Sequence, residues 1–296
     1  MIERGKSTAG AILSTTALGR GLLPLAVALA LAGCETVGGV GGSRGVAELV
    51  QDNPDASKTN IASLSEVIRA NPNDPQAYNA RGAAYARTGR YSDAMSDFNQ
   101  AIKLDPNFAA AYTNRALSLR QTGRDDQALA DFNRAIQADP NYGPAYLGRA
   151  NLLRVKGDFN QALADLSRVI QLNPESAEAF HARGLVHQRQ GQNELAIVDF
   201  RSAIDRNPFA GAPYAARGQS LVAVGKYQEA IEDFNAALNT DNRNAVAWAW
   251  RGVAFERQGD RAQATESYQR ALSIDSGNQV AREGMSRVGG GLALFR

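Results

Sequence analysis

The fold is decided by a unit that repeats without a gap. Residues 75–108 read PQAYNARGAAYARTGRYSDAMSDFNQAIKLDPNF, and residues 109–142 read AAAYTNRALSLRQTGRDDQALADFNRAIQADPNY. Further units of the same length follow at 143–176, 177–210, 211–244 and 245–278. A glycine recurs at one fixed place in all of them: Gly89, Gly123, Gly157, Gly191, Gly225 and Gly259. A fixed period of this size indicates structural repeats that stack on one another.

Each unit contains two amphipathic stretches, one on either side of the glycine. In the first unit they run over 76–88 and 92–104, with apolar residues such as Tyr78 and Phe98 recurring at helical spacing. Gly89 between them suits the left-handed backbone that ends a helix. The unit is therefore predicted to be a pair of antiparallel helices. One such pair cannot bury its apolar faces alone, so neighbouring pairs must stack.

Conserved spacing within the unit carries a family resemblance. Counted from the first residue of each unit, position 4 is aromatic, position 8 small, position 15 Gly, position 20 Ala and position 24 a large ring in all units but one. Position 24 is Phe98, Phe132, Leu166, Phe200, Phe234 and Tyr268. This pattern resembles the tetratricopeptide repeat over 75–278. The resemblance implies an all-α, right-handed α-solenoid of six stacked helix-turn-helix units.

Both ends of the predicted solenoid carry partial units. Segment 60–74 matches the second helix of a repeat whose first helix is missing, so we expect an N-terminal half-repeat. Segment 279–288 has Ala281 and Met285 on one face and polar residues elsewhere, which predicts a capping helix. Segment 289–296 begins with three glycines and ends in an apolar tail, expected to be flexible.

An arginine and an aspartate recur together in the units. Position 7 is Arg81, Arg115, Arg149, Arg183, Arg217 and Arg251, and position 23 is Asp97, Asp131, Asp165, Asp199 and Asp233, then Ser267. On helical wheels the two positions fall on the same side of the hairpin at similar height. We predict structural ion pairs within each unit. The alternatives are pairing with the next unit, or an anion-binding ridge of arginines.

The N-terminal segment has the composition of an export signal. Three basic residues precede or flank an apolar run over 22–32 that is too short to span a bilayer. The run ends in Leu31-Ala32-Gly33-Cys34, which resembles a bacterial lipobox. The resemblance implies a signal peptide over 1–33, lipidation (palmitate) of Cys34 and attachment to a membrane. Segment 34–59, rich in Gly and Ser, is expected to be a flexible tether.

Charge and motifs exclude several function classes. The chain has a formal net charge of +2, and its first 33 residues hold three bases and one acid, so the remainder is neutral and does not favour nucleic acid. No metalloprotease or dinucleotide-binding motif occurs. His181 and His187 are spaced so that they do not form a metal pair. We therefore expect no enzyme, no cofactor and no metal site.

The resemblance to the tetratricopeptide repeat implies a binding groove. In that family the first helices of the units line a concave face. The candidate groove residues in this sequence are Asn79, Arg87, Thr113, Leu117, Arg120, Leu147, Asn151, Arg154, His181, Leu185, Gln188 and Arg189. They mix apolar side chains with hydrogen-bonding groups and are mildly basic, which suits an extended peptide of some acidic character. The alternative is a solvated face.

These observations lead to one functional expectation with open alternatives. We expect a lipid-anchored, periplasm-facing scaffold that binds other envelope proteins or peptides, on the outer membrane, similar to lipoproteins that dock peptidoglycan hydrolases. The alternatives are a pilus or secretion assembly lipoprotein and an outer-membrane assembly lipoprotein. An alternative of another class is a self-associating structural protein, a homodimer for example, whose groove holds a second copy or its own Leu292–Phe295 tail.

Overall fold

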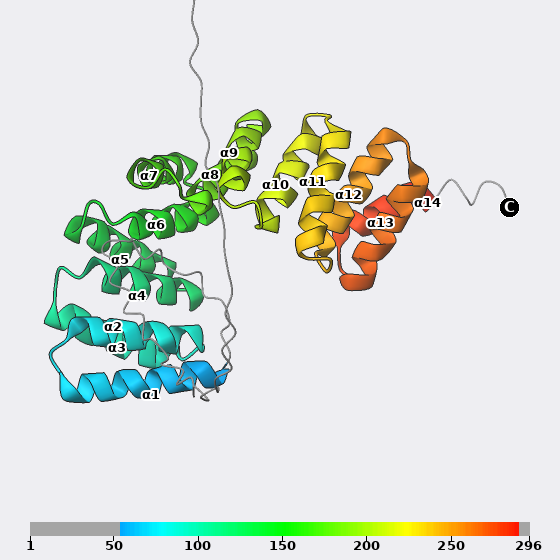
Figure 1. The fold of residues 1–296 in the computed structure, drawn as a ribbon. Helices are drawn as coiled ribbons and strands as arrows, with labels where there is room; N and C mark the ends of the chain where they lie inside the picture. The colour runs from blue at the N-terminus through cyan, green and yellow to red at the C-terminus, as the bar shows by residue number, and fades with distance from the viewer. Residues whose placement is uncertain (1–53, 290–296) are drawn as a thin grey trace, which may run out of the picture. The chain divides into compact units, whose positions relative to one another are not determined.

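The computed structural model describes residues 54–289, with side chains from residue 60 onward. Within that part every regular element is a helix, and the helices follow one another as stacked pairs (Figure 1). In chain order they are α1 (Pro54–Ala70), α2 (Pro75–Arg87), α3 (Tyr91–Leu104), α4 (Ala109–Gln121), α5 (Asp125–Ala138), α6 (Gly143–Lys156), α7 (Phe159–Leu172), α8 (Ala177–Arg189), α9 (Asn193–Arg206), α10 (Gly211–Ala223), α11 (Tyr227–Thr240), α12 (Ala245–Gln258), α13 (Arg261–Ile274) and α14 (Gln279–Gly289). The stacked helix pairs confirm the predicted α-solenoid of tetratricopeptide type.

The recurrent glycines end the first helices as predicted. All six have positive φ angles, from 73° at Gly191 to 88° at Gly259. An L-residue with a side chain adopts this left-handed backbone only at a cost in energy. The chain can therefore reverse direction between α2 and α3, and likewise in every later pair.

Small residues allow the helices of one pair to approach closely. Gly82 on α2 lies against Phe98 on α3, and a Cβ added to this glycine would stand 2.7 Å from the phenyl Cε1. Gly184 has the same relation to Phe200, at 2.6 Å. The ring is fully buried in each case. These glycines are required by packing because no side chain fits between the backbone and the ring.

The second and third units solve the same packing problem differently. Ala116 replaces the glycine in the second unit, and Phe132 there lies against Gly148 of the following unit instead. In the third unit Ala150 occurs together with the smaller Leu166, which is 1% exposed. The volume of the residue at position 24 is thus matched by a small residue nearby in every unit, either in the same unit or in the next.

Partial units cover both ends of the stack. α1 packs against α2, and it begins at Pro54, within the segment 34–59 for which a tether is expected. A proline fits the first position of a helix because the N–H it lacks would have no partner there. At the other end α14 packs against α13 and α12, with Gly284 on the ring of Tyr268.

The Tyr268 hydroxyl helps to fasten the last helix. It donates a hydrogen bond of 2.5 Å to Glu256 Oε2, and Arg287 of α14 donates two hydrogen bonds, of 2.7 Å and 2.9 Å, to the same carboxylate. Glu256 therefore links α12, α13 and α14.

Several earlier expectations fall on residues that the structure does not describe. These are the signal peptide 1–33, the lipidated Cys34, the tether up to residue 53 and the tail 290–296. Among the helices of 54–289, none is both long and apolar enough to cross a membrane.

The first helices of the units form one continuous face. α2 lies against α4, α4 against α6, α6 against α8, α8 against α10 and α10 against α12. The second helices pack on their own partners and on the next first helix rather than on one another. The surface of α2, α4, α6, α8, α10 and α12 is called the first-helix face below.

Candidate functional site

The recurrent arginine and aspartate pair within each unit. Arg149 Nε donates to Asp165 Oδ2 at 2.8 Å, and its Nη2 donates to Oδ1 at 2.7 Å. The other units with an aspartate repeat this two-pronged geometry: Arg81 with Asp97, Arg115 with Asp131, Arg183 with Asp199 and Arg217 with Asp233. The hydrogen bonds to the carboxylate raise the pKa of Arg149 above its ordinary value. Bidentate, charge-assisted bonds of this kind are the strong ones.

A third donor of some of these arginines reaches the preceding unit. Arg149 Nη1 donates to Asn133 Oδ1 at 2.7 Å, and Arg115 Nη1 makes the same bond to Asn99. Arg251 Nη1 reaches Asn235 at 2.9 Å. One guanidinium thus joins two units, through its own aspartate and the earlier asparagine. These asparagines were not predicted from the sequence, although each stands two residues after an aspartate of the repeat.

The arginines are also held by aromatic rings. The guanidinium carbon of Arg149 lies 5.7 Å from the centre of the Tyr146 ring, and Arg251 lies 4.2 Å from the Trp248 ring. Arg251 has no aspartate, and its Nε donates to Ser267 Oγ at 3.2 Å. With their donors engaged and the aspartates buried, these arginines are structural groups, and the geometry does not favour an anion-binding ridge.

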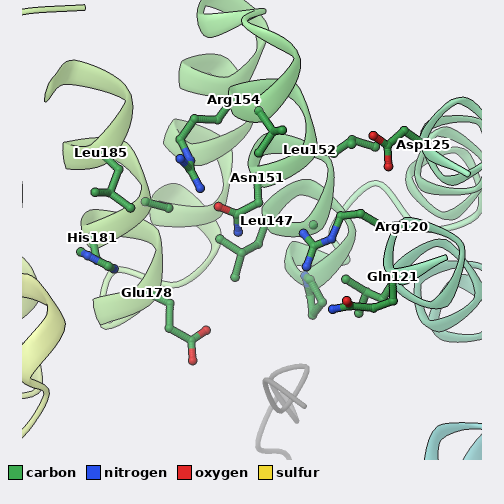
Figure 2. A pocket seen from close by; sticks show the side chains of 15 residues that line it. Arg120, Gln121, Asp125, Leu147, Asn151, Leu152, Arg154, Glu178, His181 and Leu185 are labelled. Carbon is green, nitrogen blue, oxygen red and sulfur yellow. The ribbon is translucent and has the colours of Figure 1, made fainter. Parts of the chain in front are cut away.

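A hollow opens on the first-helix face between α4, α6 and α8, with a volume of about 780 Å³. Figure 2 shows side chains from the three helices around it. Its lining residues are Leu117, Arg120, Gln121, Asp125, Pro144, Leu147, Gly148, Asn151, Leu152, Arg154, Val155, Glu178, His181, Ala182 and Leu185. We call this the α4–α8 hollow.

The α4–α8 hollow brings together a subset of the candidate groove residues. Those that line it are Leu117, Arg120, Leu147, Asn151, Arg154, His181 and Leu185. Asp125, at the first turn of α5, also lines the hollow and was not predicted, because the candidate residues all belong to first helices.

The remaining candidates lie elsewhere. Thr113 is fully buried and donates to Ala109 O at 2.9 Å, so its place on the groove surface was wrongly predicted. The Gln188 amide donates to Ala216 O and to Ser220 Oγ, both at 3.0 Å, and thereby ties α8 to α10. Asn79 accepts a hydrogen bond from Asn114. Arg87 on α2 and Arg189 on α8 are outside the lining of the hollow.

Arg154 is the unusual group of the hollow. Burial lowers the pKa of its guanidinium, and the positive charges of Arg189 and Arg120 lower it further. Its Nε is buried and has no hydrogen-bond partner within residues 60–289. A buried donor without a partner costs about 1–3 kcal/mol in a folded protein, so this Nε opposes folding.

His181 adds no positive charge to the hollow near neutral pH. Burial, and then the nearby Arg154, lower the pKa of its imidazole to about 4. Its ring lies 5.7 Å from the Phe200 ring. The other histidine, His187, contacts Gln192 Oε1 at 2.7 Å through Nδ1. Among the residues described, no group of three potential metal ligands comes together.

Solved structures share this architecture. The chain resembles the APC/C protein of the Cut9–Hcn1 structure with a TM-score of 0.70 and 19% identity, over 78% of this chain and 46% of that one. It therefore spans less than half of that protein. A structure of Pseudomonas aeruginosa pilF matches with a TM-score of 0.66 and 18% identity, over 72% of this chain and 97% of the other.

A third solved structure is slightly closer in sequence. YrrB, described as a TPR protein with an unusual peptide-binding site, matches with a TM-score of 0.54 and 25% identity, over 64% of this chain and 97% of that one. The search of curated proteins found no match.

Models of one repeat family match most of the described solenoid. The tetratricopeptide repeat models match 75–108, 109–142, 177–209 and 215–279, and a TPR repeat model matches 150–191. These matches together leave only short gaps between residues 75 and 279, and the stacked helix pairs agree with them. The chain belongs to the tetratricopeptide repeat family.

Proposed function

We propose that this protein is a lipid-anchored, periplasm-facing scaffold of the bacterial cell envelope that binds another envelope protein in the α4–α8 hollow. The observation that carries the proposal is the hollow itself. It has a volume of about 780 Å³ and combines leucine side chains with Arg154 and Arg120, and the positive charge of Arg120 helps to lower the pKa of Arg154. Tetratricopeptide solenoids are generally interaction scaffolds rather than enzymes, and their groove is where they bind peptides or proteins.

The anchoring part of the proposal is supported by the N-terminal sequence. The apolar run 22–32 is followed by Leu31-Ala32-Gly33-Cys34, and Cys34 is the sole cysteine of the chain. A lipidated Cys34 gives stable attachment without a transmembrane helix if two or more acyl chains are present. Among envelope processes we favour docking of peptidoglycan hydrolases, on the outer membrane. Pilus or secretion assembly and outer-membrane assembly are the competing processes.

Site-specific photocrosslinking in living cells tests the proposal. A photoreactive amino acid replaces Leu147 in the hollow or, as the matched control, Arg134, which is exposed on the second helix α5. Each is expressed with Cys34 or with Cys34→Ser. We expect a crosslinked partner from position 147 and little from position 134, and we expect Cys34→Ser to release the protein from membranes and reduce the crosslink.

Three results would contradict the proposal. Equal crosslinking from positions 147 and 134 would show that the hollow is not the binding surface. A crosslink only to a second copy of this chain would support the self-associating alternative. Intact membrane attachment of Cys34→Ser, with no acyl chain on Cys34 in the mass spectrum of the parent protein, would remove the lipid anchor.

A further inference from the structure

We propose that the α4–α8 hollow binds an acidic segment of an extended polypeptide, in which one Asp or Glu side chain pairs with Arg154 and Arg120. This inference rests on the proposed function, because it specifies the chemistry of the partner that the scaffold holds. It goes beyond that function in naming the recognised group and the residues that recognise it.

The first step is the unsatisfied donor. Arg154 Nε is buried, and no group within residues 60–289 accepts a hydrogen bond from it. Leaving a buried donor unpaired opposes folding, and an acceptor from a bound partner would remove that penalty. Arg154 is also not one of the recurrent structural arginines, which stand at position 7 of each unit, whereas Arg154 stands at position 12.

The second step is the charge of the missing acceptor. Arg120 and Arg189 both act on Arg154 with like charge, and His181 remains neutral at pH 7. Figure 2 shows Arg154 and Arg120 extending from neighbouring helices toward the same hollow. A carboxylate between them would remove their mutual repulsion and accept from both guanidinium groups.

The third step is the surface around the arginines. Leu117, Leu147 and Leu185 come from α4, α6 and α8 in turn and line the same hollow. A segment lying across the three helices would therefore meet a leucine from each. Asn151, on α6 between Leu147 and Arg154, offers an amide that can both donate to and accept from a peptide backbone.

An acidic residue in the hollow decides against a polyanion. Asp125, at the start of α5, also lines it. Its carboxylate would repel a nucleic acid or another uniformly charged chain, whose negative charges follow at every step. An isolated acidic side chain with apolar neighbours avoids Asp125 and still reaches Arg154 and Arg120. The occupant is thus a polypeptide segment of the kind Leu-Glu-Leu.

Peptide pools test this inference on the purified full-length protein in detergent micelles. Three fluorescein-labelled, C-terminally amidated pools share a central Leu-X-Leu with randomised flanks, where X is Glu, Gln or Lys. A fourth pool has X as Gln and a free terminal carboxylate. Binding is measured by fluorescence anisotropy against wild type, Arg154→Gln, Arg120→Gln and the control Arg134→Gln on the exposed face of α5.

We expect the Glu pool to bind wild type at least tenfold more tightly than the Gln pool, with the Lys pool weakest. Arg154→Gln and Arg120→Gln should bring the Glu pool to the level of the Gln pool, and Arg134→Gln should leave it unchanged. Circular dichroism and a melting curve show that each variant is folded. Arg154→Gln should melt no lower than wild type, because it removes a buried Nε that has no acceptor within residues 60–289.

The inference is overturned if the amidated pools bind equally or not at all, or if Arg154→Gln leaves binding of the Glu pool intact. If the pool with a free terminal carboxylate bound more tightly than the amidated Glu pool, the group recognised by Arg154 and Arg120 would be a chain terminus and not an acidic side chain. These failures differ from failure of the proposed function. A crosslinked envelope protein at position 147 would still establish the scaffold if its bound segment were not acidic.

Discussion

Replacing Asp165 by Ser would give the third unit the residue that the sixth unit carries naturally at Ser267. In the third unit Arg149 would lose the carboxylate that accepts its Nε and Nη2 hydrogen bonds at 2.8 Å and 2.7 Å. The side chains are 13% and 5% exposed, so water does not replace the lost partner fully. The substitution therefore leaves a half-buried charge without its counter-ion.

The magnitude follows from what Arg149 keeps. Breaking a buried pair by removing one partner costs about 3–5 kcal/mol, and exposed pairs contribute about 0–1 kcal/mol. Arg149 retains its bond to Asn133 Oδ1 and its place over the Tyr146 ring. We therefore expect Asp165→Ser to cost about 2–4 kcal/mol, below the full value for a buried pair.

The sixth unit offers the reverse experiment. Arg251 has a lowered pKa because of its burial, and its Nε reaches only Ser267 Oγ at 3.2 Å. Ser267→Asp should supply the absent carboxylate and gain about 1 kcal/mol, because charge-assisted bonds form but the new acid must also be buried. The neighbouring Glu266 reduces the gain through like charge.

Hydrogen exchange measured by mass spectrometry is the appropriate assay, because repeat proteins open locally rather than as one unit. Asp165→Ser should lower protection in α6 and α7 by about thirtyfold or more, and Ser267→Asp should raise it in α12 and α13. The double variant Arg149→Met, Asp165→Leu should lose much less than the single one. Equal losses for single and double variants would refute the reasoning, since the damage would then come from packing and not from an orphaned charge.

Two further predictions concern packing and the last helix. Gly184→Ala should lower the melting temperature and cost about 1–3 kcal/mol, since the new Cβ would stand 2.6 Å from the Phe200 ring. Adding Phe200→Leu should restore much of the lost stability, because the double variant copies the Ala150 and Leu166 pair of the third unit. A double variant that melts as low as Gly184→Ala would contradict the packing argument. Glu256→Gln should increase hydrogen exchange in α14, because it weakens the bonds from Arg287. These bonds lower the pKa of Glu256, so in the parent protein the protection of α14 should be complete above the ordinary carboxyl pKa of about 4.3 and should fall as the pH drops through the lower pKa of the folded state. Protection of α14 that does not depend on pH would disprove this role of Glu256.

The sequence predicted the fold because its determinants are local and repeated. The positive φ at Gly89 and the ring of Phe98 are each specified by a spacing within one unit, and six copies make the spacing visible. The two-pronged pairing of Arg149 with Asp165 also follows from helical geometry inside one hairpin. The bond to Asn133 depends on how one unit sits on the next, which no helical wheel describes.

The candidate site could be predicted from the sequence only in part, because it also depends on how neighbouring units pack. The positions that face the groove in the tetratricopeptide family placed Arg120, Arg154 and Leu147 on the surface that lines the hollow. The same rule failed for Thr113, because the packing of neighbouring first helices covers that side chain completely. It also gave no indication that Arg154 Nε would be left without an acceptor within residues 60–289, since this depends on where the acceptors of the neighbouring helices lie.

Pairing within one unit affects how such a chain can grow. A gene duplication that inserts a whole unit brings the arginine together with the aspartate that neutralises it, as Arg115 comes with Asp131. Had the aspartate served the following unit instead, each insertion or deletion would have depended on a compatible neighbour at the junction. Each of the first five units can therefore be inherited with its own neutralised arginine, and duplicating or deleting one of them changes the length of the solenoid without burying an unpaired charge.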